Sequence, residues 1–133
     1  KKFIGIKHTT SDLFALQQFK TMSCDPLVYN GFDEMLVAGL SMGADGGIGS
    51  TYNFMPEKYV KMYSLFKDGN IKEAQQIQYE ANEIITQLIK YGVFAAEKGI
   101  LDEMGIEMGG CRKPFMQLSD EGRAYCKELV KKL

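Results

Sequence analysis

A chain of 133 residues is long enough for one domain with a hydrophobic core of its own. Apolar residues make up 45% of it, charged residues 25%, and the formal net charge is −1, a balance that argues against a disordered segment and against a nucleic-acid-binding surface. No apolar run approaches the roughly 20 residues that a membrane-spanning helix needs, so we expect neither nucleic acid nor membrane as a partner.

The first predicted element is a short buried strand at residues 3–7, which ends in Lys7. Polar residues follow at once, so the lysine amine points into whatever lies beyond the end of the strand. Apolar surroundings disfavour an ammonium group, and the neutral amine that results is a nucleophile that forms a Schiff base with a ketone. The alternative is a strand-end lysine that simply reaches solvent, and these residues alone favour that alternative.

Strands and helices then alternate along the chain. The pattern predicts a helix at about residues 12–22, a strand at 27–30, a shorter helix at 32–42 and a strand at 46–50. This order is typical of an α/β fold with parallel strands and right-handed crossovers.

The rest of the chain is predicted to be helical. Helices are expected at about residues 56–69, 71–92, 93–104 and from 119 to the C-terminus. Asn70 and Glu73 form a variant of the capping box at the start of the second of these helices.

A sheet of three strands leaves two unpaired edges, and no later segment looks able to pair with them. The α/β part is therefore expected to be the tail of a larger sheet. A (β/α)8 barrel typically has about 250 residues, so this chain has the length of roughly half a barrel.

The cysteines at 24, 111 and 126 are odd in number, and no pair has metal-ligand spacing. They predict neither a disulfide framework nor a zinc site, and we expect reduced thiols in a cytoplasmic protein. The N-terminus lacks the apolar core of a signal peptide. His8, the single histidine, is expected to pack or to form a hydrogen bond at the strand end.

Four segments carry a family resemblance in the order in which they occur. They are GIKHTTSDL at residues 5–13, YNGFDE at 29–34, GADGGIGSTYN at 43–53 and CRKPF at 111–115. Together they closely resemble the N-acetylneuraminate lyases, or sialic acid aldolases, within the pyruvate-dependent class I aldolases that include dihydrodipicolinate synthase. The resemblance covers essentially the whole chain, but only the C-terminal half of such an enzyme.

The resemblance implies strands 6–8 of a (β/α)8 TIM barrel, followed by C-terminal helices. Residues 1–54 would be the last three β/α units, and residues 55–133 a helical region that completes the same domain. It also implies that Lys7 forms a Schiff base and that the reaction cleaves N-acetylneuraminate reversibly to pyruvate and N-acetylmannosamine. No metal or organic cofactor is then needed, and the full enzyme would be a homotetramer.

The resemblance further implies a set of substrate-binding residues: Thr9, Gly31, Asp33, Glu34, Gly49 and Ser50. Thr9 lies on the same side of an extended backbone as Lys7, although a β-branched residue that merely ends a strand is the alternative. The two acidic residues follow the second strand, where the active-site loops of a barrel lie, although an acidic first turn of a helix is common.

The remaining predicted contacts concern the glycine-rich segment. Gly31 and Gly49 are expected to act through main-chain groups, and Ser50 to offer its hydroxyl to distal sugar hydroxyls. The segment lacks a P-loop or dinucleotide fingerprint, which argues against phosphate binding. The tyrosines at 52, 59 and 63 are expected to pack rather than to react, and residues 111–115 to form a structural loop.

In the resembling enzymes a proton-relaying tyrosine and a loop that binds the pyruvate carboxylate precede the part that this chain matches. We therefore expect a fragment, or one half of a split enzyme, whose activity requires the missing N-terminal half of the barrel. Two alternatives stay open: another pyruvate aldolase of the dihydrodipicolinate synthase type, or a non-catalytic half-barrel that serves as an assembly module.

Overall fold

The computed structural model describes residues 2–133 and contains a sheet of three parallel strands in the order β1-β2-β3. The strands are β1 (Gly5–His8), β2 (Leu27–Asn30) and β3 (Gly46–Gly47). The α-helices are α1 (Leu13–Lys20), α2 (Leu36–Ser41), α3 (Pro56–Lys67), α4 (Ile71–Tyr91), α5 (Val93–Glu103) and α6 (Asp120–Val130). The 3-10 helices η1 (Asp33–Met35) and η2 (Thr51–Asn53) follow β2 and β3. The predicted α/β order is confirmed.

Helices cover one face of the sheet and leave the other bare. Leu16, Val28 and Ala44 form a small buried cluster between the sheet and its first helices, and Ile6 packs against it. Successive side chains of a strand point to opposite faces, so Lys7 and Leu27 lie on the other face, and both are exposed.

The first strand begins later than expected, and His8 is its only buried residue. Phe3 and Ile4 precede it and are 57% and 75% exposed. These side chains are apolar, as a buried strand requires, but no segment among residues 2–133 packs over them. Ile48, which follows β3, is likewise apolar and 46% exposed.

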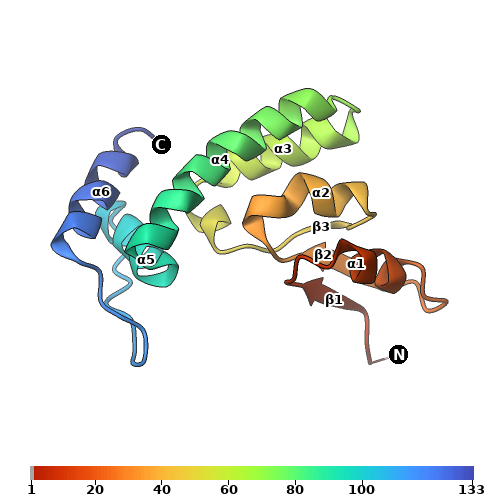
Figure 1. Cartoon of the computed structure of the whole chain (residues 1–133), viewed down its shortest axis with the longest axis horizontal. Helices are drawn as coiled ribbons and strands as arrows, with labels where there is room; N and C mark the ends of the chain where they lie inside the picture. The colour runs from red at the N-terminus through yellow and green to blue at the C-terminus, as the bar shows by residue number, and fades with distance from the viewer. Residues whose placement is uncertain (1) are drawn as a thin grey trace.

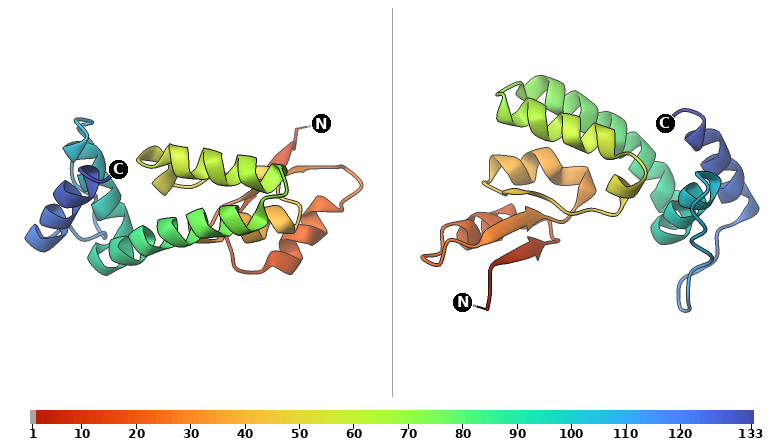
Figure 2. Two further views of the ribbon diagram at one scale, coloured as in Figure 1. Left: turned by 90° about the horizontal axis from the view of Figure 1, so that it is seen from above. Right: turned by 180° about the vertical axis from the view of Figure 1, so that it is seen from behind.

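The helical region packs on α2 and extends away from the sheet. The antiparallel pair α3 and α4 lies over α2, while α5 and α6 lie at the end of the molecule farthest from the N-terminus (Figures 1 and 2). One hydrophobic core runs through this region from Leu36 to Leu129 and includes side chains from both predicted parts of the chain.

The helix ends are set by local signals, one of which differs from the prediction. Ser119 caps α6 by accepting a hydrogen bond from Gly122 N at 3.1 Å. The capping box expected at α4 is wrong, since the Asn70 side chain makes no capping hydrogen bond. The Asn70 N–H already donates to Leu65 O at 2.8 Å, so the backbone donor that Glu73 would have satisfied is occupied.

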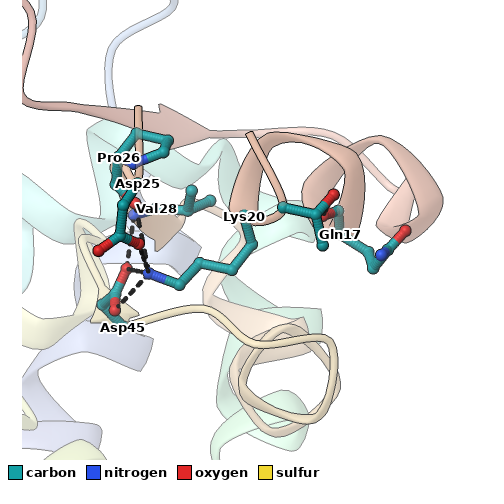
Figure 3. A network of polar contacts seen from close by, with 7 residues as sticks. Gln17, Lys20, Asp25, Pro26, Val28 and Asp45 are labelled. Atoms are coloured by element: carbon teal, nitrogen blue, oxygen red, sulfur yellow. Dashed lines mark hydrogen bonds and ion pairs between the residues drawn. The ribbon is translucent and has the colours of Figure 1, made fainter. Parts of the chain in front are cut away.

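An ion pair holds the N-terminal edge of the sheet (Figure 3). Lys20 Nζ lies 2.9 Å from Asp45 Oδ1, and Asp45 Oδ2 accepts a hydrogen bond from Val28 N at 2.7 Å. Burial alone would raise the pKa of Asp45, but the hydrogen bonds from Val28 and Lys20 outweigh it and hold the pKa below its ordinary value. The contact joins the end of α1 to the segment that precedes β3.

Three other findings bear on the sequence-based expectations. No helix in residues 2–133 combines the length and apolar character needed to cross a bilayer. Across the same residues, no group of three or more histidine, cysteine, aspartate or glutamate side chains is arranged to hold a metal ion. All three cysteines are free thiols, and the buried His8 donates a hydrogen bond from Nε2 to Asp12 O at 2.8 Å, as expected of a strand-end histidine.

Candidate active site

Apart from Lys7, which lies within β1, the predicted site residues follow the carboxyl ends of the three strands, which lie side by side. Gly31 N donates to His8 O at 2.8 Å, and Ile48 N donates to Asn30 O at 2.9 Å. These two hydrogen bonds continue the ladder past the strand ends, so the turns after β1, β2 and β3 lie side by side. This is the edge at which parallel α/β folds place their ligands.

Lys7 lies one residue inside this edge, on the bare face of the sheet. Its neighbour in register is Tyr29 on β2, which in turn pairs with Gly46 on β3. The lysine is exposed, and within residues 2–133 it has no hydrogen bond or ion pair. The expected apolar enclosure of Lys7 is therefore not observed, because nothing in the described residues 2–133 covers the face toward which this side chain points.

Thr9 and Gly31 are in direct contact. A β-carbon added to Gly31 would lie 2.0 Å from Thr9 Oγ1, so only glycine fits beside this side chain. Thr9 is otherwise exposed and, by the alternation of a strand, lies on the same side as Lys7. The structure thus places a hydroxyl group next to bare backbone near the Schiff-base candidate.

Asp33 binds the loop that follows β3 through hydrogen bonds. The aspartate is 7% exposed, and its Oδ2 accepts hydrogen bonds from Thr51 N at 2.8 Å and Thr51 Oγ1 at 2.6 Å. A β-carbon on Gly49 would lie 1.7 Å from Asp33 Oδ1, so the loop backbone passes directly over the carboxylate. One oxygen of Asp33 is therefore engaged within the protein, and the other faces Gly49.

Glu34 is partly exposed beside Asp33, on a turn that α4 supports through polar contacts. Gln78 donates to Asp33 O at 3.0 Å and accepts from Val37 N at 3.1 Å, and Asn82 donates to Glu34 O at 3.1 Å. Sequence reasoning missed this support. The available signal was Gln78 itself, a polar residue within the apolar stripe of α4 that turns out to be 5% exposed.

The tyrosines near Asp33 experience its negative charge. The rings of Tyr52 and Tyr59 stack with centroids 3.8 Å apart, and the Tyr59 hydroxyl lies 2.6 Å from Thr51 Oγ1. Burial raises the pKa of both phenols far above the ordinary value, and the Asp33 charge raises it further. Both hydroxyls therefore stay protonated, as expected for packing residues, and the buried Tyr52 hydroxyl has no hydrogen-bond partner within residues 2–133.

Ser50 contacts a residue that the sequence did not single out. The exposed Ser50 donates a hydrogen bond of 2.6 Å to Oε1 of Glu97 on α5. Glu97 is only 7% exposed, and burial raises its pKa, an effect that the Ser50 hydrogen bond reduces and the Asp33 charge increases. The signal available in the sequence was a lone carboxylate among the small residues of α5 that pack inward, such as Ala96 and Gly99.

The functional groups at the C-terminal ends of the strands determine which chemistry this part of the sheet can support. It offers one primary amine, two hydroxyls and several carboxylate and main-chain oxygens, the groups that bind a ligand rich in hydroxyls beside a reactive carbonyl. The chain belongs to the dihydrodipicolinate synthetase family, whose model matches residues 1–133.

Among its relatives is an N-acetylneuraminate lyase from Rhizobium meliloti, 44% identical over 96% of this chain and 42% of that protein. The N-acetylneuraminate lyase of Fusobacterium nucleatum complexed with pyruvate superimposes with a TM-score of 0.89 at 37% identity, over 98% of this chain and 45% of that one. A catalytic lysine mutant of the sialic acid aldolase of Ruminococcus gnavus does so with a TM-score of 0.84 at 35% identity, over 92% of this chain and 41% of that one.

The chain thus spans less than half the length of the relatives it matches. The predicted resemblance to N-acetylneuraminate lyases is confirmed, as is the predicted fold, the C-terminal part of a TIM-barrel aldolase. In a complete barrel the bare face would point inward, and the outer edges of β1 and β3 would pair with further strands.

Proposed function

We propose that this chain supplies the C-terminal half of the active site of an N-acetylneuraminate lyase, with Lys7 as its Schiff-base lysine. The observation that carries the proposal is the convergence of Thr9, Gly31, Asp33 and Gly49 in two direct contacts at the strand edge next to Lys7. Its relatives are N-acetylneuraminate lyases, which supports the same substrate, and the sialic acid aldolase of R. gnavus has a catalytic lysine, which supports a lysine in the chemistry.

The reaction starts on the open-chain form of N-acetylneuraminate. The neutral amine of Lys7 attacks the C2 ketone, and loss of water with uptake of one proton gives a protonated imine. Breaking the C3–C4 bond sends its electron pair into this imine, while the C4 hydroxyl gives up its proton and becomes the aldehyde of N-acetylmannosamine. The enamine that remains takes up a proton at C3, and attack by water then releases pyruvate, one proton and the neutral amine. The lysine accepts the electrons itself, so neither metal nor organic cofactor takes part.

The sugar lies along the strand edge in this proposal. Thr9 holds the oxygen next to the bond that breaks, and main-chain groups at Gly31 and Gly49 line the path of the chain. Glu34 and Oδ1 of Asp33, which lies against Gly49, accept hydrogen bonds from sugar hydroxyls, and Ser50 meets the distal ones. The second oxygen of Asp33 already binds Thr51, so Asp33 combines substrate contact with support of the loop.

The missing half of the barrel supplies the rest of the site. The proton relay, the loop for the pyruvate carboxylate and the walls that would enclose Lys7 belong to that half, and enclosure is what favours the neutral amine. The completed enzyme would be a cytoplasmic homotetramer.

The test uses the completed protein, by which we mean this chain joined to the N-terminal half of a barrel, either its own or that of the R. meliloti relative. It is assayed for pyruvate release from N-acetylneuraminate, and borohydride reduction with pyruvate is used to trap the imine. Modification at Lys7 and loss of at least about 1,000-fold in kcat for Lys7→Met are expected, with Lys61→Met as the control at an exposed lysine. Turnover by Lys7→Met, or trapping elsewhere, would refute the assignment.

The same assays separate the alternatives. The family's description favours a dihydrodipicolinate synthase activity as the second candidate. Such an enzyme would trap pyruvate on Lys7 but leave N-acetylneuraminate intact and condense pyruvate with aspartate semialdehyde instead. A non-catalytic assembly module would trap no pyruvate.

A further inference from the structure

A buried carboxylate on α5 accepts a hydrogen bond from a hydroxyl at the candidate site. Ser50 is exposed at the C-terminal ends of the strands, and its Oγ donates to Glu97 Oε1 at 2.6 Å. The two residues are 47 positions apart in the chain, so the contact arises from the packing of α5 against the loop after β3.

The backbone of Ser50 is fixed independently of this contact. Gly49 passes over Asp33, Thr51 N donates to Asp33 Oδ2 at 2.8 Å, and Asn53 donates to Ser50 O at 2.8 Å. The Ser50 side chain makes no capping hydrogen bond to η2, so its hydroxyl is not consumed by the helix that it precedes. The remaining freedom is rotation of the hydroxyl group, and Glu97 is the partner that sets it.

The direction of this hydrogen bond determines what Ser50 can offer to a ligand. A hydroxyl group has one hydrogen to donate and two lone pairs to accept with. Because the hydrogen points to Glu97, only the lone pairs face outward, and the group acts as an acceptor. A sugar hydroxyl can satisfy it by donating, whereas an ether or ester oxygen at the same place cannot.

We infer that Glu97 is a positioning residue, which orients Ser50 as a hydrogen-bond acceptor and thereby makes the site select substrates with free hydroxyls at the distal end of the sugar. The inference rests on the proposed function and extends it to a residue outside the strand edge. Glu97 is nearly covered, so it acts through Ser50 rather than on the sugar itself.

The experiment measures the aldol direction in the completed protein, where the KM for each reactant is separate. Glu97→Leu removes the acceptor while keeping a similar volume, and the KM for N-acetylmannosamine is expected to rise about five- to tenfold. The KM for pyruvate and the rate of borohydride trapping stay unchanged, because neither involves the distal hydroxyls. Glu97→Gln keeps an acceptor oxygen and restores most of the affinity.

Two further variants separate positioning from general damage. The double variant Ser50→Ala with Glu97→Leu is expected to be no worse than Ser50→Ala alone, since Glu97 acts only through that hydroxyl. Glu103→Gln, at the exposed end of the same helix, serves as the matched control and is expected to behave like the parent protein.

The results separate a failure of the positioning role of Glu97 from a failure of the proposed lyase function. Equal rises in the KM for both reactants, no restoration by Glu97→Gln, or additive losses in the double variant would overturn the positioning role alone. Absence of imine trapping and of turnover in the parent protein would overturn the proposed function, and the inference with it.

Discussion

An aspartate joins neighbouring segments at each end of the parallel strands, but only one of the two aspartates is paired with a cation. The N-terminal edge denotes the end of the sheet at which the strands begin, and the C-terminal edge the end at which they finish. At the N-terminal edge Asp45 accepts from Val28 N and pairs with Lys20 at 2.9 Å (Figure 3). At the C-terminal edge Asp33 accepts from Thr51 N and from the Thr51 hydroxyl, and no cation pairs with it within residues 2–133. Lys20 thus balances the charge of Asp45, whereas Asp33 is bound only by the neutral donors of Thr51.

The consequence appears in the groups nearby. The Asp33 charge contributes to raised pKa values at Tyr52, Tyr59 and Glu97, whereas Lys20 and Asp45 each stabilise the ionised form of the other. An unpaired buried carboxylate is costly for folding but keeps an acceptor available for ligand hydroxyls. The paired aspartate lies at the N-terminal ends of the strands, and the aspartate without a cation lies at the C-terminal ends, where barrel enzymes place their active sites.

The largest expected effect is that of Asp33→Ala in the completed protein. The substitution leaves the N–H of Thr51 without its acceptor and releases the loop over Gly49, so we expect a loss of about 3 kcal/mol in the free energy of unfolding. The displaced loop should also lower kcat/KM for N-acetylneuraminate by about 100-fold. Urea unfolding and pyruvate release measure the two effects, and an active, fully stable variant would contradict the role of Asp33.

Asp45→Ala sharpens the contrast from the opposite edge. The loss of the hydrogen bond from Val28 N and of the ion pair with Lys20 should reduce the free energy of unfolding by about 1–2 kcal/mol. The kcat and KM should remain those of the parent protein, because this edge faces away from the site. A fall in kcat/KM comparable to that of Asp33→Ala would remove the distinction between the edges.

The acid dependence of stability should have opposite signs at Asp45 and Glu97. The pKa of Asp45 is lowered from 3.8, so its contribution is present above about pH 4 and is lost as the pH falls through the folded-state value. The pKa of Glu97 is raised from 4.5, so its contribution is present below that value and is lost as the pH rises through the folded-state value.

The corresponding variants make this difference measurable. Relative to the parent protein, Asp45→Asn should be destabilised near neutral pH and approach it in acid. Glu97→Gln should become relatively more stable as the pH rises from about 4 to about 7. Urea midpoints across this range are the measurement, and parallel pH profiles for the two variants would contradict the expectation.

The smallest effects are expected from two tyrosine hydroxyls on α3, one near each edge. Tyr59 lies 2.6 Å from Thr51 Oγ1, and Tyr63 donates to Asp45 O at 3.2 Å. Tyr59→Phe should lower the free energy of unfolding by about 1 kcal/mol, and Tyr63→Phe by about 0.5 kcal/mol, because the second hydrogen bond is longer and less buried. Equal losses would show that the burial of the C-terminal edge adds nothing to this bond.

Much of the fold followed from periodicity and turn residues. The bounds of β2 were predicted as observed, because Leu27–Asn30 is apolar and set off by a proline and a glycine. The strand expected at 46–50 ends at Gly47, since a glycine-rich segment carries almost no side-chain pattern from which to read an end. The capping box failed because its backbone donor is used by the preceding helix, which local sequence does not reveal.

The candidate site was predictable only in part, for two physical reasons. Family resemblance singled out the residues after each strand, and the structure brings Thr9 to Gly31 and Asp33 to Gly49, while their roles toward substrate stay predictions. Nothing within residues 2–133 encloses Lys7, so the enclosure expected from the sequence stays a prediction. The contact of Ser50 with Glu97 depends on how α5 packs, and no short-range pattern encodes it.

The length of α4 has a consequence for how this protein can change. Gln78 and Asn82 attach the helix to the turn that bears Asp33, and nine residues further on Tyr91 ends it, just before α5 carries Glu97 to the loop. Adding or deleting one residue of α4 between Asn82 and Tyr91 would rotate α5, with Glu97, by about 100° about the axis of α4 and shift it by about 1.5 Å. Substitutions on the solvent side of α4 should thus be tolerated, whereas insertions belong in the exposed loop between α5 and α6.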